Sequence, residues 1–197
     1  MSVVDINGDG YPDIYVCQQG PYAPEQRKNL FYINNGDLTF TESAAEMGLD
    51  DENYSTQAAF FDYDKDGDLD CYVMNESKYV GVVLATVFED LKEEKNMRAA
   101  SGKLFENQGN LKFKDVTKSA GMMKYGYGLG LAISDFNGDN WLDVYVANDY
   151  TVPDFMYINQ KDGTFKESVA EYTKQTSYFG MGCDAVSYTH LTLPTKA

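Results

Sequence analysis

Short runs of β-branched and aromatic residues recur along this chain of 197 residues, and turn-forming residues bound each run. Three of the runs directly follow acidic clusters: Ile-Tyr-Val-Cys at 14–17, Cys-Tyr-Val-Met at 71–74 and Val-Tyr-Val-Ala at 144–147. Runs of this length and composition are typical of strands rather than helices. The hydrophobic pattern therefore predicts an all-β protein.

Further strands follow each of these runs at a variable distance. Residues 30–40, 104–113 and 155–165 place apolar residues on either side of an Asn-, Gly- and Asp-rich turn, a pattern that predicts β-hairpins. Residues 57–61 and 128–133 form one more apolar run before the second and third acidic clusters. The repeating unit is thus strand, acidic loop, strand, connection, strand, hairpin and strand.

Four antiparallel strands per unit match a propeller blade, and the unequal spacing of the units argues against a solenoid, which keeps a stricter period. The loops begin at Asp5, Asp62 and Asp135, so the second unit is longer than the first. We expect a fragment of a β-propeller with about three four-stranded blades in residues 1–185.

The acidic loops share one nine-residue pattern. Carboxylate or carboxamide side chains occupy positions 1, 3, 5 and 9, a tight-turn residue occupies position 6, and position 7 would offer its backbone carbonyl. Calcium takes six to eight oxygen ligands, and alternate residues of a curled loop can converge on one ion. The sequence therefore predicts about three Ca²⁺ sites. The candidate ligands are Asp5, Asn7, Asp9, Tyr11 and Asp13 in the first loop, Asp62, Asp64, Asp66, Asp68 and Asp70 in the second, and Asp135, Asn137, Asp139, Trp141 and Asp143 in the third.

Other calcium-binding motifs fit less well. An EF-hand has a bidentate Glu at position 12 and flanking helices, whereas position 12 here is Val16, Val73 or Val146 and strands follow each loop. The same strands argue against a dockerin, in which similar loops are followed by helices. At position 6, Gly10 and Gly67 allow the positive φ that the curl demands, and Asn is the best other residue there. The alternative is an acidic turn without a metal, in which the clustered carboxylates would repel one another.

The second unit contains an insertion between residues 75 and 103. Within it Val80, Val83, Leu84, Val87 and Leu91 recur at helical spacing, which predicts a short amphipathic helix. The helix would pack on its own blade, or the insertion would form a lid for a binding partner.

Composition narrows the classes of function. The net charge is −15, and the ten carboxylates at positions 1, 3, 5 and 9 of the loops account for much of it. So acidic a surface repels phosphate backbones, which argues against nucleic acid as a partner. No apolar run has the length of a transmembrane segment, and no signal peptide opens the chain.

The cysteines, Cys17, Cys71 and Cys183, are odd in number, and two lie in predicted strands where Cys behaves as a small hydrophobe. We expect buried free thiols; one disulfide or a catalytic thiol are the alternatives. Tyr and Phe are abundant and should fill the contacts between blades, although an exposed Tyr150 could stack on a sugar.

The last residues depart from the repeat. Residues 186–195 resemble the in-frame translation of a sequencing adapter, and a fourth acidic loop expected at position 187 meets Ser187 instead. We interpret residues 186–197 as a non-native tail; the alternative is a divergent C-terminal strand. His190, the sole histidine, would then not belong to the protein, and Ser–His or Cys–His chemistry would lack its base.

These features together resemble FG-GAP/VCBS repeats. The resemblance rests on the acidic loops, the strand end Tyr145-Val-Ala-Asn-Asp-Tyr150 and the hairpin Asn34-Asn-Gly-Asp-Leu-Thr-Phe40. Such repeats build the propellers of integrin α-chain heads, and this version looks most like the ASPIC/UnbV group, which is similar to cartilage acidic protein. The resemblance implies a seven-bladed parent with calcium in its blade loops, in a secreted, periplasmic or cell-surface setting. Asn140 at position 6 and the long insertion depart from the family pattern.

Two classes of function remain open. The first is a non-catalytic module in which calcium stiffens the blades and loops on one face bind a protein or a glycan. The second is the accessory propeller of a secreted enzyme, since similar repeats accompany some polysaccharide lyases and phospholipases. The dense Asp clusters are all assigned to metal sites, and no leftover pair of carboxylates stands out as acid and base. We therefore expect no catalytic residues in this chain.

Overall fold

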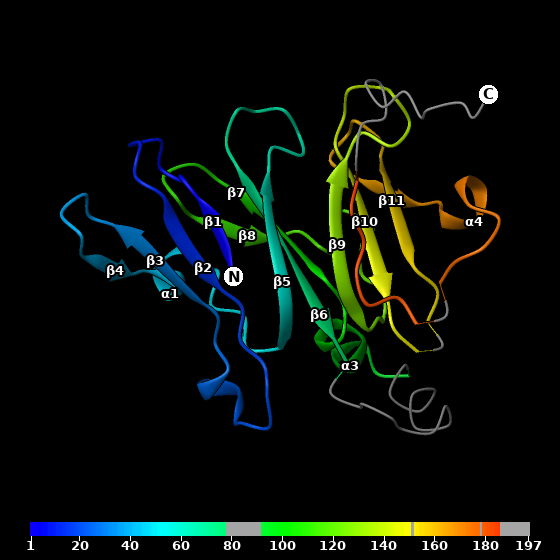
Figure 1. Cartoon of the computed structure of the whole chain (residues 1–197), viewed down its shortest axis with the longest axis horizontal. Coiled ribbons are helices and arrows are strands. Elements are labelled where there is room, and N and C mark those ends of the chain that lie inside the picture. Colours follow the sequence, from blue (N-terminus) through cyan, green and yellow to red (C-terminus); the bar gives the residue numbers. More distant parts are fainter. Residues whose placement is uncertain (78–91, 151, 178, 186–197) are drawn as a thin grey trace, which may run out of the picture.

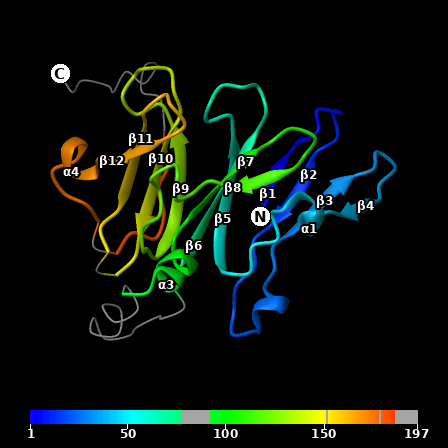
Figure 2. The same cartoon turned by 180° about the vertical axis from the view of Figure 1, so that it is seen from behind.

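The structure is a computed structural model that describes residues 1–77, 92–150, 152–177 and 179–185. It contains three four-stranded antiparallel sheets that lie side by side (Figures 1 and 2). In every sheet the strands neighbour one another in chain order, so each sheet is a simple meander. The all-β prediction and the four-stranded repeat are confirmed, and the sheets are the blades of a β-propeller.

The blades are defined by their strands. Blade 1 comprises β1 (Ser2–Val4), β2 (Asp13–Val16), β3 (Leu30–Asn34) and β4 (Phe40–Glu42); blade 2 comprises β5 (Tyr54–Phe61), β6 (Asp70–Glu76), β7 (Lys103–Asn107) and β8 (Phe113–Asp115); blade 3 comprises β9 (Gly128–Ser134), β10 (Asp143–Asn148), β11 (Phe155–Asn159) and β12 (Phe165–Glu167).

Short helices lie in the connections. They are η1 (Pro24–Gln26), α1 (Ala44–Met47), α3 (Glu94–Ala99) and α4 (Val169–Tyr172). The helix predicted from Val80 to Leu91 lies outside the described residues, as does the tail 186–197. None of the helices in the described part of the chain has the length and apolar character that crossing a membrane requires.

The register of the first two strands is the same in all blades. Position 9 of the acidic loop is the first residue of the second strand, and it pairs with the last residue of the first strand. The pairs are Val4 with Asp13, Phe61 with Asp70 and Ser134 with Asp143. Each acidic loop therefore closes a hairpin, and because the strands are antiparallel, all three lie at the same end of their blades as the second hairpin turn (Figure 1).

Two hydrophobic clusters join the blades, and β6 contributes to both. Tyr72 and Met74 face blade 3, whereas the alternate residues Cys71 and Val73 face blade 1. A strand buried on both faces is apolar at successive positions, as the sequence of β6 is. The first strands of adjacent blades are also hydrogen-bonded: the Ser2 hydroxyl donates to the Ala58 carbonyl at 2.5 Å, and that of Thr56 to the Gly128 carbonyl at 2.9 Å.

Candidate metal centres

The curl of each acidic loop depends on position 6. Gly10, Gly67 and Asn140 have φ values of 87°, 98° and 67°, all in the left-handed region. The expectation of positive φ is confirmed at all three residues, including the one where Asn replaces Gly.

Positions 3 and 5 of every loop form Asx turns. The side-chain oxygen at position 3 accepts from the backbone N–H at position 5, and that at position 5 accepts from the N–H at position 7. In the second loop the acceptors are Asp64 and Asp66, at 3.2 and 2.8 Å. These bonds hold the side-chain oxygens against the backbone of the loop, and carboxylate oxygens keep lone pairs for a further ligand.

Position 9 is buried and holds the blade together. Asp13, Asp70 and Asp143 are at most 1% exposed, and in each the two carboxylate oxygens accept separate backbone N–H bonds. For Asp70, one donor is Tyr63 at the start of its own loop and the other is Asn107 at the end of β7. The sequence indicated only a ligand role for position 9, whereas the structure adds a link between the loop and the third strand.

The residue that completes this link is an Asn in each blade, for which the sequence indicated only a role in the turn. Asn34, Asn107 and Asn159 donate their backbone N–H to the position-9 carboxylate at 2.8 Å. Their amide groups also donate to the carbonyl of the residue before that Asp, at 3.2 to 3.3 Å. We call this pair of hydrogen bonds from one Asn to the end of the acidic loop the clamp. Its signal in the sequence was the Asn at the same place in all three hairpins.

The second loop brings its carboxylates closest together. One oxygen from each of Asp62, Asp64 and Asp70 lies within 4.8 Å of the others. Among the residues that the structure describes, Asp62 Oδ1 is the buried side-chain polar atom without a hydrogen-bond partner. A buried carboxylate oxygen left unpaired is costly, so an ion that accepts oxygen ligands would relieve it. The donor set of this loop fits a hard cation.

Electrostatics also set the second loop apart. Burial, together with the nearby Asp64 and Asp66, raises the pKa of Asp70 to about 7 although two backbone N–H groups oppose this. Burial likewise raises the pKa of Asp64, again with neighbouring carboxylates contributing. Shifts in this direction mean that negative charge in the loop lacks compensation, which a bound cation would supply.

In the first and third loops, more of the position-1 carboxylate oxygens accept hydrogen bonds from the loop backbone than in the second loop. Both carboxylate oxygens of Asp5 accept N–H bonds, from Asp9 and Gly10, and both oxygens of Asp135 do the same. Position 3 in these loops is Asn7 or Asn137, so each has one carboxylate fewer at positions 1, 3, 5 and 9 than the second loop. These backbone bonds outweigh burial and lower the pKa of Asp135.

The position-7 residues lie in their loops. That their backbone carbonyls bind a metal ion stays a prediction. Tyr11 is half exposed, and Asp68 is exposed while its backbone N–H donates to Asp66. Trp141 lies beneath the ammonium of Lys65 from the second loop, 4.6 Å from the ring centroid, so that adjacent loops touch.

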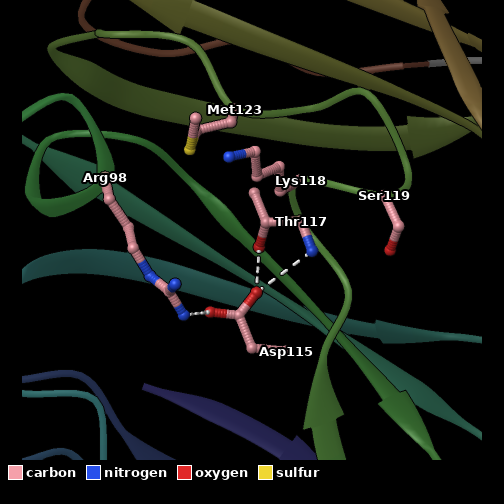
Figure 3. A pocket seen from close by; sticks show the side chains of 6 residues that line it. All are labelled: Arg98, Asp115, Thr117, Lys118, Ser119 and Met123. Atoms are coloured by element: carbon pink, nitrogen blue, oxygen red, sulfur yellow. Dashed lines mark hydrogen bonds and ion pairs between the residues drawn. The ribbon is translucent and has the colours of Figure 1, made fainter. Parts of the chain in front are cut away.

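A separate hollow lies at the end of blade 2 opposite its acidic loop, and Figure 3 shows the side chains that line it. Its volume is about 330 Å³, and it is lined by Arg98, Asp115, Thr117, Lys118, Ser119 and Met123. The Arg98 guanidinium and the Asp115 carboxylate point toward one another at 2.6 Å, and the Thr117 hydroxyl donates to the same carboxylate. Most of the residues that line the hollow are polar or charged, and Met123 adds an apolar wall.

The remaining candidate residues are structural. All three cysteines are free, with Cys71 buried and the other two half-buried. Burial raises the pKa of each thiol, that of Cys17 to about 11, so none is activated as a nucleophile. Tyr150 is half-buried against Tyr127, with ring centroids 5.2 Å apart, and is not the exposed stacking platform that the sequence suggested.

Three meander blades with acidic first loops define this chain as an array of β-propeller blades that carry candidate cation sites. A protein family described as the FG-GAP-like repeat matches residues 5–73 and 135–187, which are well over half of the chain. The chain belongs to the FG-GAP-like repeat family.

Comparison with other proteins adds little beyond the family. A solved structure of a lectin from Agrocybe aegerita, described as recognising non-reducing terminal N-acetylglucosamine, is 18% identical, with a TM-score of 0.46. The similarity covers 91% of this chain, which spans 41% of the length of the lectin chain. No curated protein matches the chain.

Proposed function

We propose that the chain is a calcium-stabilised propeller module that acts outside the cell or on its surface and binds a protein or glycan ligand. The observation that carries the calcium part is the second loop, where one oxygen from each of Asp62, Asp64 and Asp70 lies within 4.8 Å of the others and Asp62 Oδ1 has no hydrogen-bond partner. The residues that would hold the ion there are Asp62, Asp64, Asp66 and Asp70, with the backbone carbonyl of Asp68.

Calcium is favoured over magnesium by the donors. The loop offers many oxygens on a flexible curl, whereas Mg²⁺ demands near-ideal octahedral geometry and retains several waters. The bound ion would neutralise the carboxylates, and the clamp through Asp70 and Asn107 would transmit its stabilisation to the third strand. An extracellular setting would suit sites with dissociation constants on the order of 10⁻⁴ to 10⁻³ M.

Calorimetry and thermal unfolding of the 197-residue chain test this part. Calcium should bind with measurable heat and raise the melting temperature. At a calcium concentration of 100 times the dissociation constant, the free energy of unfolding should rise by about 2.7 kcal/mol for one site. Asp62→Asn should lose the binding at the second site, while Asp37→Asn, which changes an exposed carboxylate in a hairpin turn, should not. Equal melting temperatures in calcium and in chelator would overturn the proposal.

The ligand would meet the end of the blades opposite the acidic loops. The second strand of each blade ends there and the third begins, and the hollow beside α3 combines hydrogen-bonding groups with the apolar wall of Met123, as sugar and peptide sites do. A glycan array and a pull-down with the chain, compared with Lys118→Ala and with the exposed control Lys114→Ala, test this part. Binding lost only in Lys118→Ala supports the site, and binding unaffected by either change overturns it.

The module is proposed to bind without catalysing a reaction. Incubation with polysaccharides separates the two classes: retention without product release supports the binding module, whereas release of shorter products overturns it in favour of a role in catalysis.

A further inference from the structure

In the third loop, the ammonium group of a lysine pairs with one of the candidate metal ligands. Lys161, in the turn between β11 and β12, places its ammonium 3.1 Å from Asp139 Oδ2, the carboxylate at position 5 of the loop. The same oxygen accepts from the Asn137 amide at 3.0 Å. The lysine side chain is 46% exposed and that of Asp139 24%, so the pair lies at the mouth of the loop.

The backbone holds Lys161 at this place. Its N–H donates to Asn159 Oδ1 at 2.8 Å, and the Asn159 N–H donates to Asp143 at position 9 of the loop. The lysine is thus tied to the loop through two consecutive hydrogen bonds.

The other two blades have glycine at the equivalent position. Gly36 and Gly109 also lie two residues after the clamp Asn and donate their N–H to its Oδ1, at 3.0 and 3.1 Å. Their φ values are 77° and 82°, and that of Lys161 is 67°. A left-handed conformation favours Gly and is costly for a long side chain. Lys161 therefore occupies a left-handed position at which the other two blades have glycine.

A second lysine near these loops does not play the same part. Lys65 is at position 4 of the second loop, and its ammonium lies over the ring of Trp141 in the third loop. The second loop keeps its unpartnered Asp62 Oδ1 despite this lysine.

We propose that Lys161 competes with the metal ion at the third loop, so that this site binds calcium more weakly than the second and fills after it. This inference rests on the proposed calcium binding. A cation that approaches Asp139 must displace the ammonium or bind beside it, and like charges so close repel one another. In the absence of metal, the ammonium would compensate the loop charge in its place.

The single tryptophan reports on the third site once binding at the second loop, whose Lys65 lies on the same ring, has been removed with Asp62→Asn. Trp141 is at position 7 of this loop, so terbium bound there can be excited through tryptophan at wavelengths where tyrosine does not absorb. Terbium titration, followed by displacement with calcium, should show about two- to fivefold tighter binding in Lys161→Gln, as expected for removing an exposed ion pair. Lys161→Gly, which restores the residue of the other blades and relieves the left-handed strain, should show the same gain.

Two controls isolate the charge at this position. Lys161→Arg keeps the cation and should bind as the unchanged chain does. Lys166→Gln removes an exposed lysine of the same blade that pairs with Glu171, at 2.7 Å, and should also leave the affinity unchanged.

The outcomes are distinct. A gain in affinity in both neutral variants supports the inference, because a merely structural lysine would weaken the site when removed. Terbium binding with equal or lower affinity in both overturns it and leaves the proposed calcium binding standing. Absence of metal binding in the unchanged chain and in every variant overturns both.

Discussion

The backbone N–H of Asn107 donates a 2.8 Å hydrogen bond to Asp70 Oδ1, and this bond ties the acidic loop of blade 2 to the end of its third strand. The same bond recurs between Asn34 and Asp13 in blade 1 and between Asn159 and Asp143 in blade 3. The position-9 carboxylate therefore belongs both to the candidate cation site and to the framework of its blade.

We expect Asn107→Ala to destabilise the chain by about 1–3 kcal/mol, because it removes two side-chain hydrogen bonds, to the partly buried Leu69 carbonyl and from the Gly109 N–H. Urea unfolding with a constant m-value measures the loss. Gln108→Ala, in the exposed turn next to it, serves as the control and should change the free energy of unfolding by less than about 0.5 kcal/mol. Equal stability of the two variants would contradict the side-chain part of this link, since alanine keeps the backbone N–H that donates to Asp70.

Asp66→Ala should weaken calcium binding at the second loop, whereas Asp68→Ala should not, because Asp68 would offer only its backbone carbonyl. Calorimetry of each variant measures the difference. Since the Asp66 side chain also accepts the Asp68 N–H at 2.8 Å, Asp66→Asn provides the control that keeps the turn and removes the charge. Similar losses from Asp66→Ala and Asp68→Ala would show that the ligand assignment is wrong.

Gly128→Ala should loosen the contact between blades 2 and 3. An added Cβ would lie 2.5 Å from Met74 Cγ and 3.3 Å from Val146 Cγ1, and overpacking of this kind costs about 1–3 kcal/mol. Thermal unfolding measures the effect, and Met74→Ala in the same chain should recover part of it. Gly182→Ala, where a Cβ meets nothing within 4 Å, is the matched control.

The Cys17 thiol should label slowly in the folded chain. Burial raises its pKa to about 11, so near pH 8.5 its thiolate fraction is on the order of a hundredfold below that of an unfolded thiol. The protonated thiol contributes stability that is fully present below the unfolded pKa and lost as pH rises toward about 11. Alkylation followed by peptide mass spectrometry, with the urea-unfolded chain as reference, measures the rate. Equal rates in the folded and unfolded chain would refute the prediction.

Local features of the fold could be predicted from the sequence because they depend on neighbouring residues. Alternating apolar residues specified the strands, and the Asn-Gly and Asp-Gly turns specified the hairpins. The left-handed conformation at Gly10, Gly67 and Asn140 followed from the turn chemistry of the loop alone.

Other features depended on residues far apart in the chain. The largely buried ion pair of Lys103 with Asp51, at 2.5 Å, joins β7 to the connection between blades 1 and 2, and neither residue is part of a motif. The ammonium of Lys161 reaches Asp139 only because the blade folds its second hairpin back beside its first loop. The repeat determined the blades and the oxygen-rich loops by itself, since short-range turn chemistry and periodicity specify them. Tertiary packing decided which carboxylates are buried, which oxygen lacks a partner and which loop contains its own cation, because burial and charge pairing arise only when distant segments meet.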